Sequence, residues 1–170
     1  FGIGVDADLR DAANNIVQVG QGGIGLGVRD YYVNDDDQTK KIREAYKAYM
    51  KKLFQMVGND EATAQKKMEA VMAIETRIAK ASYSQVELRN IDKNYHKMTY
   101  NQLVTDYPGI DWGNVFLASG FPAFKEICVG QPEPIHEVEK VLAETSLDDL
   151  KTYAEIKVIA GATSVLSDDF

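Results

Sequence analysis

The first residues whose types and spacing suggest a ligand-binding function lie in a glycine-dense segment near the N-terminus. Gly20, Gly22 and Gly25 match the spacing of a dinucleotide fingerprint, whose backbone N–H groups approach a pyrophosphate closely. Such a loop must open a helix directly, whereas we expect Leu26–Val33 to be extended and find no βαβ pattern after it. The sequence also lacks the Gly-Lys-Ser/Thr of a phosphate loop. We therefore interpret the segment as an irregular turn whose glycines allow positive φ and close backbone approach.

Zinc binding is the second chemistry that the sequence raises. The run from His136 to Lys140 reads His-Glu-Val-Glu-Lys and begins like the His-Glu-x-x-His motif. Two histidines one helical turn apart are needed to place both imidazoles on one zinc ion, and lysine cannot replace the second at neutral pH. Because His96 is the only other histidine, we predict neither a metal ligand nor a catalytic residue in this chain.

One carboxylate stands out because of its surroundings. Glu75 lies at helical spacing among apolar residues, so its side chain is predicted to be buried. A buried carboxylate needs a partner, and Arg89, Arg77 and Arg29 are the candidates, with Arg89 preferred. We favour a structural ion pair over a catalytic acid, since no second group of a mechanism accompanies Glu75. Cys128, between two apolar residues, is likewise interpreted as buried rather than nucleophilic.

Composition excludes several classes of protein. The net charge of −7 over 170 residues, without a basic cluster, argues against nucleic-acid and anionic-lipid partners. A single cysteine and the absence of Asn-x-Ser/Thr argue against a disulfide-stabilised, glycosylated ectodomain and suit a bacterial protein. No apolar run reaches the ~18 residues that a membrane helix needs. Because the chain opens on Phe1 without methionine and closes on Ser167–Phe170 straight after a helical pattern, we expect an excerpt of a longer protein.

Apolar periodicity predicts a mainly α (α+β) fold, with helical hairpins and a small N-terminal β-hairpin. Residues 1–33 alternate in parts with period two and contain the glycine-rich turn, whereas residues 34–170 are predicted to be helical. Two long helices are expected from Ile42 to Val57 and from Asp60 to Ser82, with Gly58 ending the first. Shorter helices follow, and Glu126–Val129 is a candidate strand. An exposed apolar patch is expected around four aromatic residues, Trp112, Phe116, Phe121 and Phe124.

Several ordered blocks resemble the neprilysin and endothelin-converting-enzyme family of zinc metallopeptidases. Gln21–Tyr32 resembles the family segment Gln-x-Gly-Leu-x-Leu-x-x-Arg-Asp-Tyr-Tyr, and Met72–Ala79 is similar to its Glu-(x)₃-Ala helix. Arg89, followed by Tyr95–Thr99, resembles an Arg…Tyr-Asn-Lys-Met-Thr block, and Pro108–Trp112 fits Pro-x-Ile-Asp-Trp. The similarity covers most of the chain.

The resemblance implies a role in a longer enzyme. In that family a largely helical N-terminal lid region caps a C-terminal catalytic region, which carries His-Glu-x-x-His, the third zinc ligand and the substrate-gripping element. This chain would then enclose the cleft and limit substrate size, with zinc in the parent enzyme and none here. Its partners would be the catalytic region and peptide substrates, in the periplasm or outside a bacterial cell. We predict that the chain alone is inactive.

Two alternatives remain open at this point: a stand-alone helical interaction module, and an inactive family member. Structural roles are predicted for six residues that carry the resemblance or the buried charge: Glu75, Arg89, Arg29, Asp30, Tyr31 and Trp112. No substrate-binding residue can be assigned from the sequence.

Overall fold

A computed structural model describes residues 1–165, and Ser167–Phe170, where the sequence closes, lie outside the described residues. The chain divides into two compact units. The first, here called the sheet unit, combines Phe1–Gly23 with Ala81–Ala143, and the second, the helical unit, combines Ile24–Lys80 with Glu144–Phe170. The glycine segment is therefore one of the places where the chain passes from one unit to the other.

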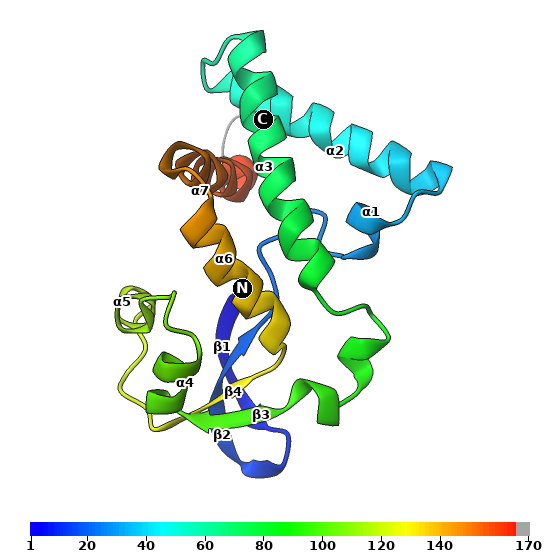
Figure 1. The fold of residues 1–170 in the computed structure, drawn as a ribbon. Helices are drawn as coiled ribbons and strands as arrows, with labels where there is room; N and C mark the ends of the chain where they lie inside the picture. Colours follow the sequence, from blue (N-terminus) through cyan, green and yellow to red (C-terminus); the bar gives the residue numbers. More distant parts are fainter. Residues whose placement is uncertain (166–170) are drawn as a thin grey trace. The chain divides into compact units, whose positions relative to one another are not determined.

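The sheet unit is built on four strands in the order β1-β2-β4-β3 (Figure 1). β1 (Gly2–Asp8) and β2 (Asp11–Gly20) form the predicted antiparallel hairpin. β2 pairs in parallel with β4 (Glu126–Val129), which confirms the candidate strand, and β4 pairs antiparallel with β3 (His96–Thr99). The sequence did not predict β3, because its four residues form a ladder only with β4.

Helices complete the sheet unit and contribute to its core. These are α4 (Tyr100–Asp106), α5 (Trp112–Ala118) and α6 (Pro132–Glu144), with the 3₁₀ turns η1 (Glu87–Arg89) and η2 (Asp92–Asn94). A capping box between Thr99 and Gln102 begins α4 by satisfying otherwise free N–H groups. The core combines side chains of strands and helices, including Val19, Leu103, Trp112, Ile127 and Ile135.

The helical unit contains α1 (Asp30–Val33), α2 (Asp37–Met56), α3 (Glu61–Ala81), α7 (Leu147–Ala162) and the 3₁₀ turn η3 (Thr163–Val165). The long helices α2 and α3 confirm the two predicted from periodicity. Gly58, with φ of +97°, follows α2 as the C′ glycine, a position that favours glycine. The unit is held by a core that includes Met50, Phe54, Ala64, Val71 and Ile156.

The extended conformation predicted for Leu26–Val33 is wrong in its second half, because Asp30–Val33 is the one-turn helix α1. Arg43 of α2 accounts for this turn, since its guanidinium donates to the carbonyl oxygens of Tyr31 (3.1 Å) and Asn34 (2.5 Å). The predicted fold class, mainly α with N-terminal strands, is confirmed. Among the described residues, none of the helices combines the length and apolar character needed to span a membrane.

Candidate functional site

A buried carboxylate on α3 organises the helical unit. The side chain of Glu75 is 0% exposed, which confirms the burial predicted from helical spacing. Its Oε1 atom lies 2.5 Å from Nζ of Lys157 on α7 and accepts a hydrogen bond of 3.0 Å from the backbone N–H of Gly25. The same oxygen accepts from the Tyr46 hydroxyl at 3.3 Å, and Oε2 accepts from the Tyr32 hydroxyl at 2.6 Å. Four donors thus satisfy this buried charge.

The pairing of Glu75 with Arg89 predicted from the sequence is wrong. Arg89 lies at the end of η1 with an exposed side chain, and the cation that meets Glu75 is Lys157. Lys157 lies between Ile156 and Val158, in a mostly apolar part of α7. A single cation in such a run was the available signal, but the distance of 82 residues along the chain hid its partner.

The glycine segment is anchored on this carboxylate. Besides the bond from Gly25, the backbone N–H of Leu26 donates to the Tyr32 hydroxyl at 3.0 Å. Because this hydroxyl donates in turn to Glu75, it bridges the loop and the carboxylate. A Cβ atom at position 25 would overlap the Tyr46 hydroxyl, so a larger residue there would force the tyrosine or the loop to move. The glycines therefore let the backbone approach a protein carboxylate, and the dense motif is explained without a nucleotide.

The tyrosines around Glu75 are held as proton donors. The pKa of Tyr32 and that of Tyr46 are raised well above the usual value of tyrosine, mainly by burial and next by the negative charge of Glu75. Burial followed by the same charge raises the pKa of Tyr153 to about 12. Each hydroxyl thus keeps its proton through the physiological range. With its acceptor positions occupied, Glu75 has the geometry of a structural anchor.

The other residues predicted to be structural occupy separate places. At the start of α1, Nη1 of Arg29 lies 3.7 Å from Oδ1 of Asp30. The Nε atom of Arg29 is buried and has no hydrogen-bond partner among the described residues. The Tyr31 carbonyl receives the Arg43 guanidinium. Trp112 is 1% exposed in the core of the sheet unit, where its indole N–H donates to the Tyr107 carbonyl at 3.0 Å.

The exposed aromatic patch expected around Trp112 is therefore wrong in part. Trp112 and Phe116 are buried, whereas Phe121 and Phe124 are half-buried. Phe116 stacks on Trp112 with ring centroids 5.9 Å apart, which explains why both are withdrawn from solvent. Beside them lies an apolar cavity of about 280 Å³, lined in part by Phe121, Phe124 and Leu117.

Gln21, at the start of the glycine segment, clamps the sheet unit through both backbone and side chain. Its amide exchanges two hydrogen bonds with the backbone of Tyr83, at 2.6 and 3.1 Å. Its backbone N–H donates to the Gln131 side chain at 2.7 Å, and Gln131 in turn donates to Asn94 at 2.6 Å. Sequence reasoning missed this clamp because neutral amides give no charge signal.

A second buried carboxylate, Asp8, closes the hairpin of the sheet unit. It is 2% exposed and accepts from the Arg10 backbone N–H (2.9 Å), the Tyr95 hydroxyl (2.7 Å) and Nζ of Lys97 (3.2 Å). The Arg10 N–H is the largest of the causes that hold the pKa of Asp8 below its usual value, followed by the Tyr95 hydroxyl. Lys97 also pairs with Glu126 at 3.0 Å.

Neither histidine is arranged to bind zinc. His136 Nδ1 lies 2.9 Å from Glu139, and its ring stacks on Tyr107 with centroids 4.5 Å apart. His96 Nδ1 lies 2.9 Å from the Val129 carbonyl oxygen in the sheet. Within residues 1–165, His, Cys, Asp and Glu form no group of three that could hold a metal ion. The residues present therefore do not fit a zinc site, and no step of a zinc reaction is assigned to them.

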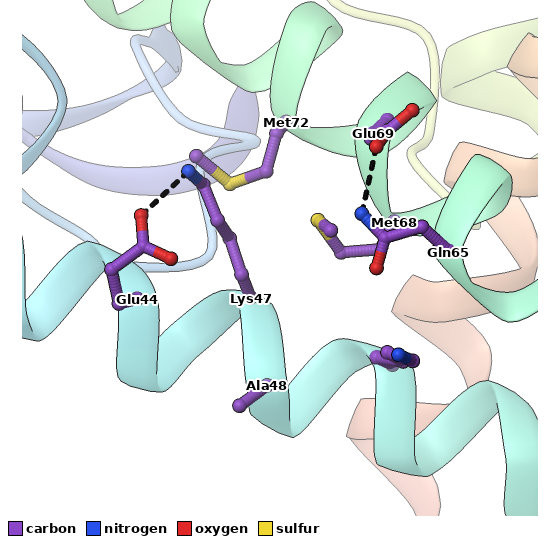
Figure 2. A pocket seen from close by; sticks show the side chains of 8 residues that line it. Glu44, Lys47, Ala48, Gln65, Met68, Glu69 and Met72 are labelled. Carbon is purple, nitrogen blue, oxygen red and sulfur yellow. Dashed lines mark hydrogen bonds and ion pairs between the residues drawn. The ribbon is translucent and has the colours of Figure 1, made fainter. Parts of the chain in front are cut away.

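A groove of about 440 Å³ lies between α2 and α3 (Figure 2). Figure 2 shows Met68 and Met72 of α3 in its wall, with charged side chains around them. These polar groups are engaged with one another or with neighbours: Lys47 pairs with Glu44 at 2.8 Å, and Gln65 donates to Glu69 at 2.7 Å. Because these polar groups are paired, the groove is interpreted as an open surface between two packed helices and not as a reactive site.

Comparison with known proteins gives a consistent result over the whole chain. A family model described as "Peptidase family M13" matches residues 1–170. Endothelin-converting enzyme 1 of Rattus norvegicus is 29% identical over 175 residues, which cover 100% of this chain and 23% of the relative. An endothelin-converting enzyme homolog of Locusta migratoria is 29% identical over 98% of this chain and 24% of its own length.

Solved structures agree with the sequence matches. The cryo-EM structure of Mycobacterium tuberculosis zinc metalloprotease ZMP1 in an open state superposes with a TM-score of 0.92 at 29% identity, over 99% of this chain and 26% of that chain. The crystal structure of PepO from Lactobacillus rhamnosis, 20% identical with a TM-score of 0.83, shows the same fold. The chain thus spans about a quarter of the length of these proteins.

Proposed function

This chain belongs to peptidase family M13, and we propose that it forms a non-catalytic, largely helical part of a zinc-dependent metalloendopeptidase. In the parent enzyme it would enclose the substrate cleft and limit the size of the peptides that enter. The family membership confirms the resemblance to endothelin-converting enzymes that the ordered sequence blocks indicated. The observation that carries the proposal is the family match over the whole chain, together with a 29% identity to a structure named as a zinc metalloprotease.

The buried acidic side chains and the histidines of this chain already have protein partners, which favours placing the catalytic groups in another part of the polypeptide. Glu75 and Asp8 are surrounded by donors, His136 is engaged by Glu139 and Tyr107, and His96 lies against a carbonyl. Zinc, the general base and the substrate-gripping groups are therefore proposed for a C-terminal catalytic region. This region and peptide substrates are the proposed partners of the chain, and the contribution of residues 1–170 is steric selection and exclusion of water.

The first experiment compares residues 1–170 with the full-length polypeptide. We expect the purified 170-residue chain to bind no stoichiometric zinc and to cleave no peptide, whereas the full-length protein should do both and lose activity with a chelator. Chelator-sensitive cleavage by the 170-residue chain would overturn the non-catalytic assignment. A full-length protein without zinc or activity would identify an inactive family member.

The enclosing role needs a separate readout, the ratio of kcat/KM for a large unfolded substrate such as casein to that for a short peptide. Substituting Glu75→Gln in the full-length enzyme should loosen the helical unit and raise this ratio, because a less rigid enclosure excludes large substrates less well. The matched control is Glu69→Gln, an exposed carboxylate on the same helix. An unchanged ratio in an enzyme with measurably lower thermal stability would argue against size selection.

We further propose a periplasmic or cell-envelope location, or secretion, in a bacterium. One cysteine and no glycosylation acceptor suit a bacterial protein that does not rely on disulfides. Fractionation of the native host, with immunodetection of the chain, checks this location. Recovery with the cytoplasmic fraction would overturn it.

A further inference from the structure

The guanidinium of Arg29, at the start of α1, is incompletely bonded. Its Nε atom is the one buried side-chain nitrogen or oxygen that has no hydrogen-bond partner within residues 1–165. Its ion pair with Asp30 joins Nη1 to Oδ1 at 3.7 Å, which is longer than a hydrogen bond. By contrast, the guanidinium of Arg43 in the same unit donates to two carbonyl oxygens and to Asp35. Because buried polar groups in folded proteins almost always have a partner, the Nε–H group of Arg29 calls for an acceptor from elsewhere.

The turn that carries Arg29 is anchored on both sides. The Arg29 carbonyl accepts from the backbone N–H of Tyr32 at 2.9 Å, and the Tyr32 hydroxyl donates to Glu75 at 2.6 Å. The Arg43 guanidinium holds the neighbouring Tyr31 carbonyl at 3.1 Å. The backbone is thus fixed, while 33% of the Arg29 side chain remains exposed. A donor that is positioned in advance and can be reached from solvent is suited to binding a ligand group.

The free atoms of the guanidinium indicate which kind of acceptor fits. Asp30 meets Nη1, so the other edge of the group, formed by Nε and Nη2, is engaged by none of the residues from 1 to 165. The two N–H groups of this edge match the two oxygens of a carboxylate, which a guanidinium binds as a bidentate pair. A buried water fits less well, because it bridges about three polar groups. Within the described part of the chain, Nε has no second unpaired buried side-chain atom with which to share such a water.

We propose that Arg29 is a binding residue for a carboxylate that lies beyond residues 1–170. This carboxylate belongs either to an acidic peptide substrate or to an aspartate or glutamate in the rest of the same polypeptide, since the chain spans about a quarter of the length of its relatives. Both sources present the same chemistry to the Nε–Nη2 edge, and the experiment separates them. The inference rests on the proposed function in that residues 1–170 are part of a longer peptide hydrolase.

The first arm of the test measures thermal stability. Arg29→Met keeps an apolar stem of similar length and removes the guanidinium. In the 170-residue chain it should leave the melting temperature unchanged or slightly raised, because no hydrogen-bonded partner is lost. If the carboxylate belongs to the same polypeptide, Arg29→Met should lower the melting temperature of the full-length protein, since the acceptor is then left unpaired. The control is Lys41→Gln, which removes one positive charge from an exposed position on α2 and should leave both proteins unchanged.

The second arm measures peptide binding by the zinc-depleted full-length protein, so that the peptides are not cleaved. The probes are dansyl-labelled, C-terminally amidated octapeptides of alanine and glycine with one glutamate at each position in turn, each matched by the same peptide with glutamine. If the substrate supplies the carboxylate, glutamate at one position should bind about tenfold more tightly than glutamine, and Arg29→Met should abolish this preference. Arg29→Lys should retain only part of it, because an ammonium keeps the charge but not the bidentate edge. Lys41→Gln should leave the preference unchanged.

Two results would overturn the proposal. One is an equal loss of stability in the 170-residue chain and in the full-length protein, which would place the partner of Arg29 within the chain. The other is unchanged stability of Arg29→Met in both proteins together with an unchanged or absent preference for glutamate, which would leave only solvent around Nε. Neither arm needs peptide cleavage, so a full-length protein without activity would refute the proposed function and leave this inference to its own two readouts.

Discussion

Two buried carboxylates, one in each unit, accept hydrogen bonds from the same kinds of protein donor. Glu75 in the helical unit and Asp8 in the sheet unit are 0% and 2% exposed. Each accepts from a lysine, from at least one tyrosine hydroxyl and from a backbone N–H. In both, the desolvation that burial imposes on a charge is offset by donors held in place by the fold.

The difference lies in how many separate segments supply the donors. The donors to Glu75 come from the glycine segment, α1, α2 and α7, so one carboxylate holds four separate segments. Asp8 accepts from Arg10, two positions on, and from Tyr95 and Lys97, which lie next to and on β3, 87 and 89 residues further along the chain. Lys97 is shared with Glu126. We infer that Glu75 stabilises the helical unit as a whole, whereas Asp8 joins the end of the β1–β2 hairpin to β3.

The largest effect is expected from Glu75→Gln. The change leaves the Lys157 ammonium without its counter-charge and replaces an acceptor of four hydrogen bonds by an amide that must also donate. Breaking a buried pair from one side costs about 3–5 kcal/mol, and partial exposure of Lys157 places this case at the lower end. Urea unfolding of the 170-residue chain measures it, with Glu69→Gln as the control expected within about 0.5 kcal/mol of the original chain. Unchanged stability of Glu75→Gln would remove the central role given to this carboxylate.

Gly25→Ala tests the close approach of the glycine segment. The added methyl group overlaps the Tyr46 hydroxyl, so the ring must move away from Glu75 or the loop must lose its bond to the carboxylate. Overpacking of this kind costs about 1–3 kcal/mol. Gly161→Ala is the matched control, since its methyl group meets open space within a helix and should be neutral or stabilising by up to ~1 kcal/mol. Equal melting temperatures for the two variants would contradict the steric explanation.

Removing one hydroxyl from the Glu75 cluster should have a smaller effect than Glu75→Gln, comparable with that of Gly25→Ala. Tyr32→Phe deletes the donor to Glu75 and the acceptor of the Leu26 N–H while the ring stays in the core. A lost buried hydrogen bond to a charged group costs about 1.5–3 kcal/mol. Tyr49→Phe on α2, where the side chain is 40% exposed, should be close to neutral. Thermal unfolding of both variants decides whether the cluster or aromatic packing alone holds α1.

Local periodicity predicted the parts of the fold that depend on neighbouring residues. The β1–β2 hairpin, the long helices α2 and α3 and the burial of Glu75 follow from spacing within one segment, and they are confirmed. The one-turn helix α1 was missed because its last carbonyls are satisfied by Arg43, ten residues beyond its end. The strand β3 was missed because its register exists only against β4.

The candidate site was harder to predict, since it depends on how distant segments pack. Arg89 was preferred among three candidate arginines, yet the cation is Lys157, which lies 82 residues away and reaches the carboxylate through the packing of α7. Trp112 was expected as part of an exposed apolar patch, but its indole N–H donates to the Tyr107 carbonyl inside the core. Charge type and burial can thus be inferred from sequence, whereas the identity of the partner cannot.

The smallest effect, and the sharpest contrast between the two carboxylates, is expected from Asp8 under acid. The fold holds the pKa of Asp8 below its unfolded value of about 4, so its stabilising contribution is present above that pH and is lost as pH falls through the folded pKa. Other carboxylates with lowered pKa, such as Glu87 with a pKa of about 2, add to the acid sensitivity of the chain. The informative quantity is therefore the difference in melting temperature between the original chain and Asp8→Asn. This difference should be largest near neutral pH and should shrink on acidification below about pH 4, because protonation makes Asp8 resemble its amide. A difference that is independent of pH would mean that Asp8 acts through its shape and hydrogen bonds and not through its charge.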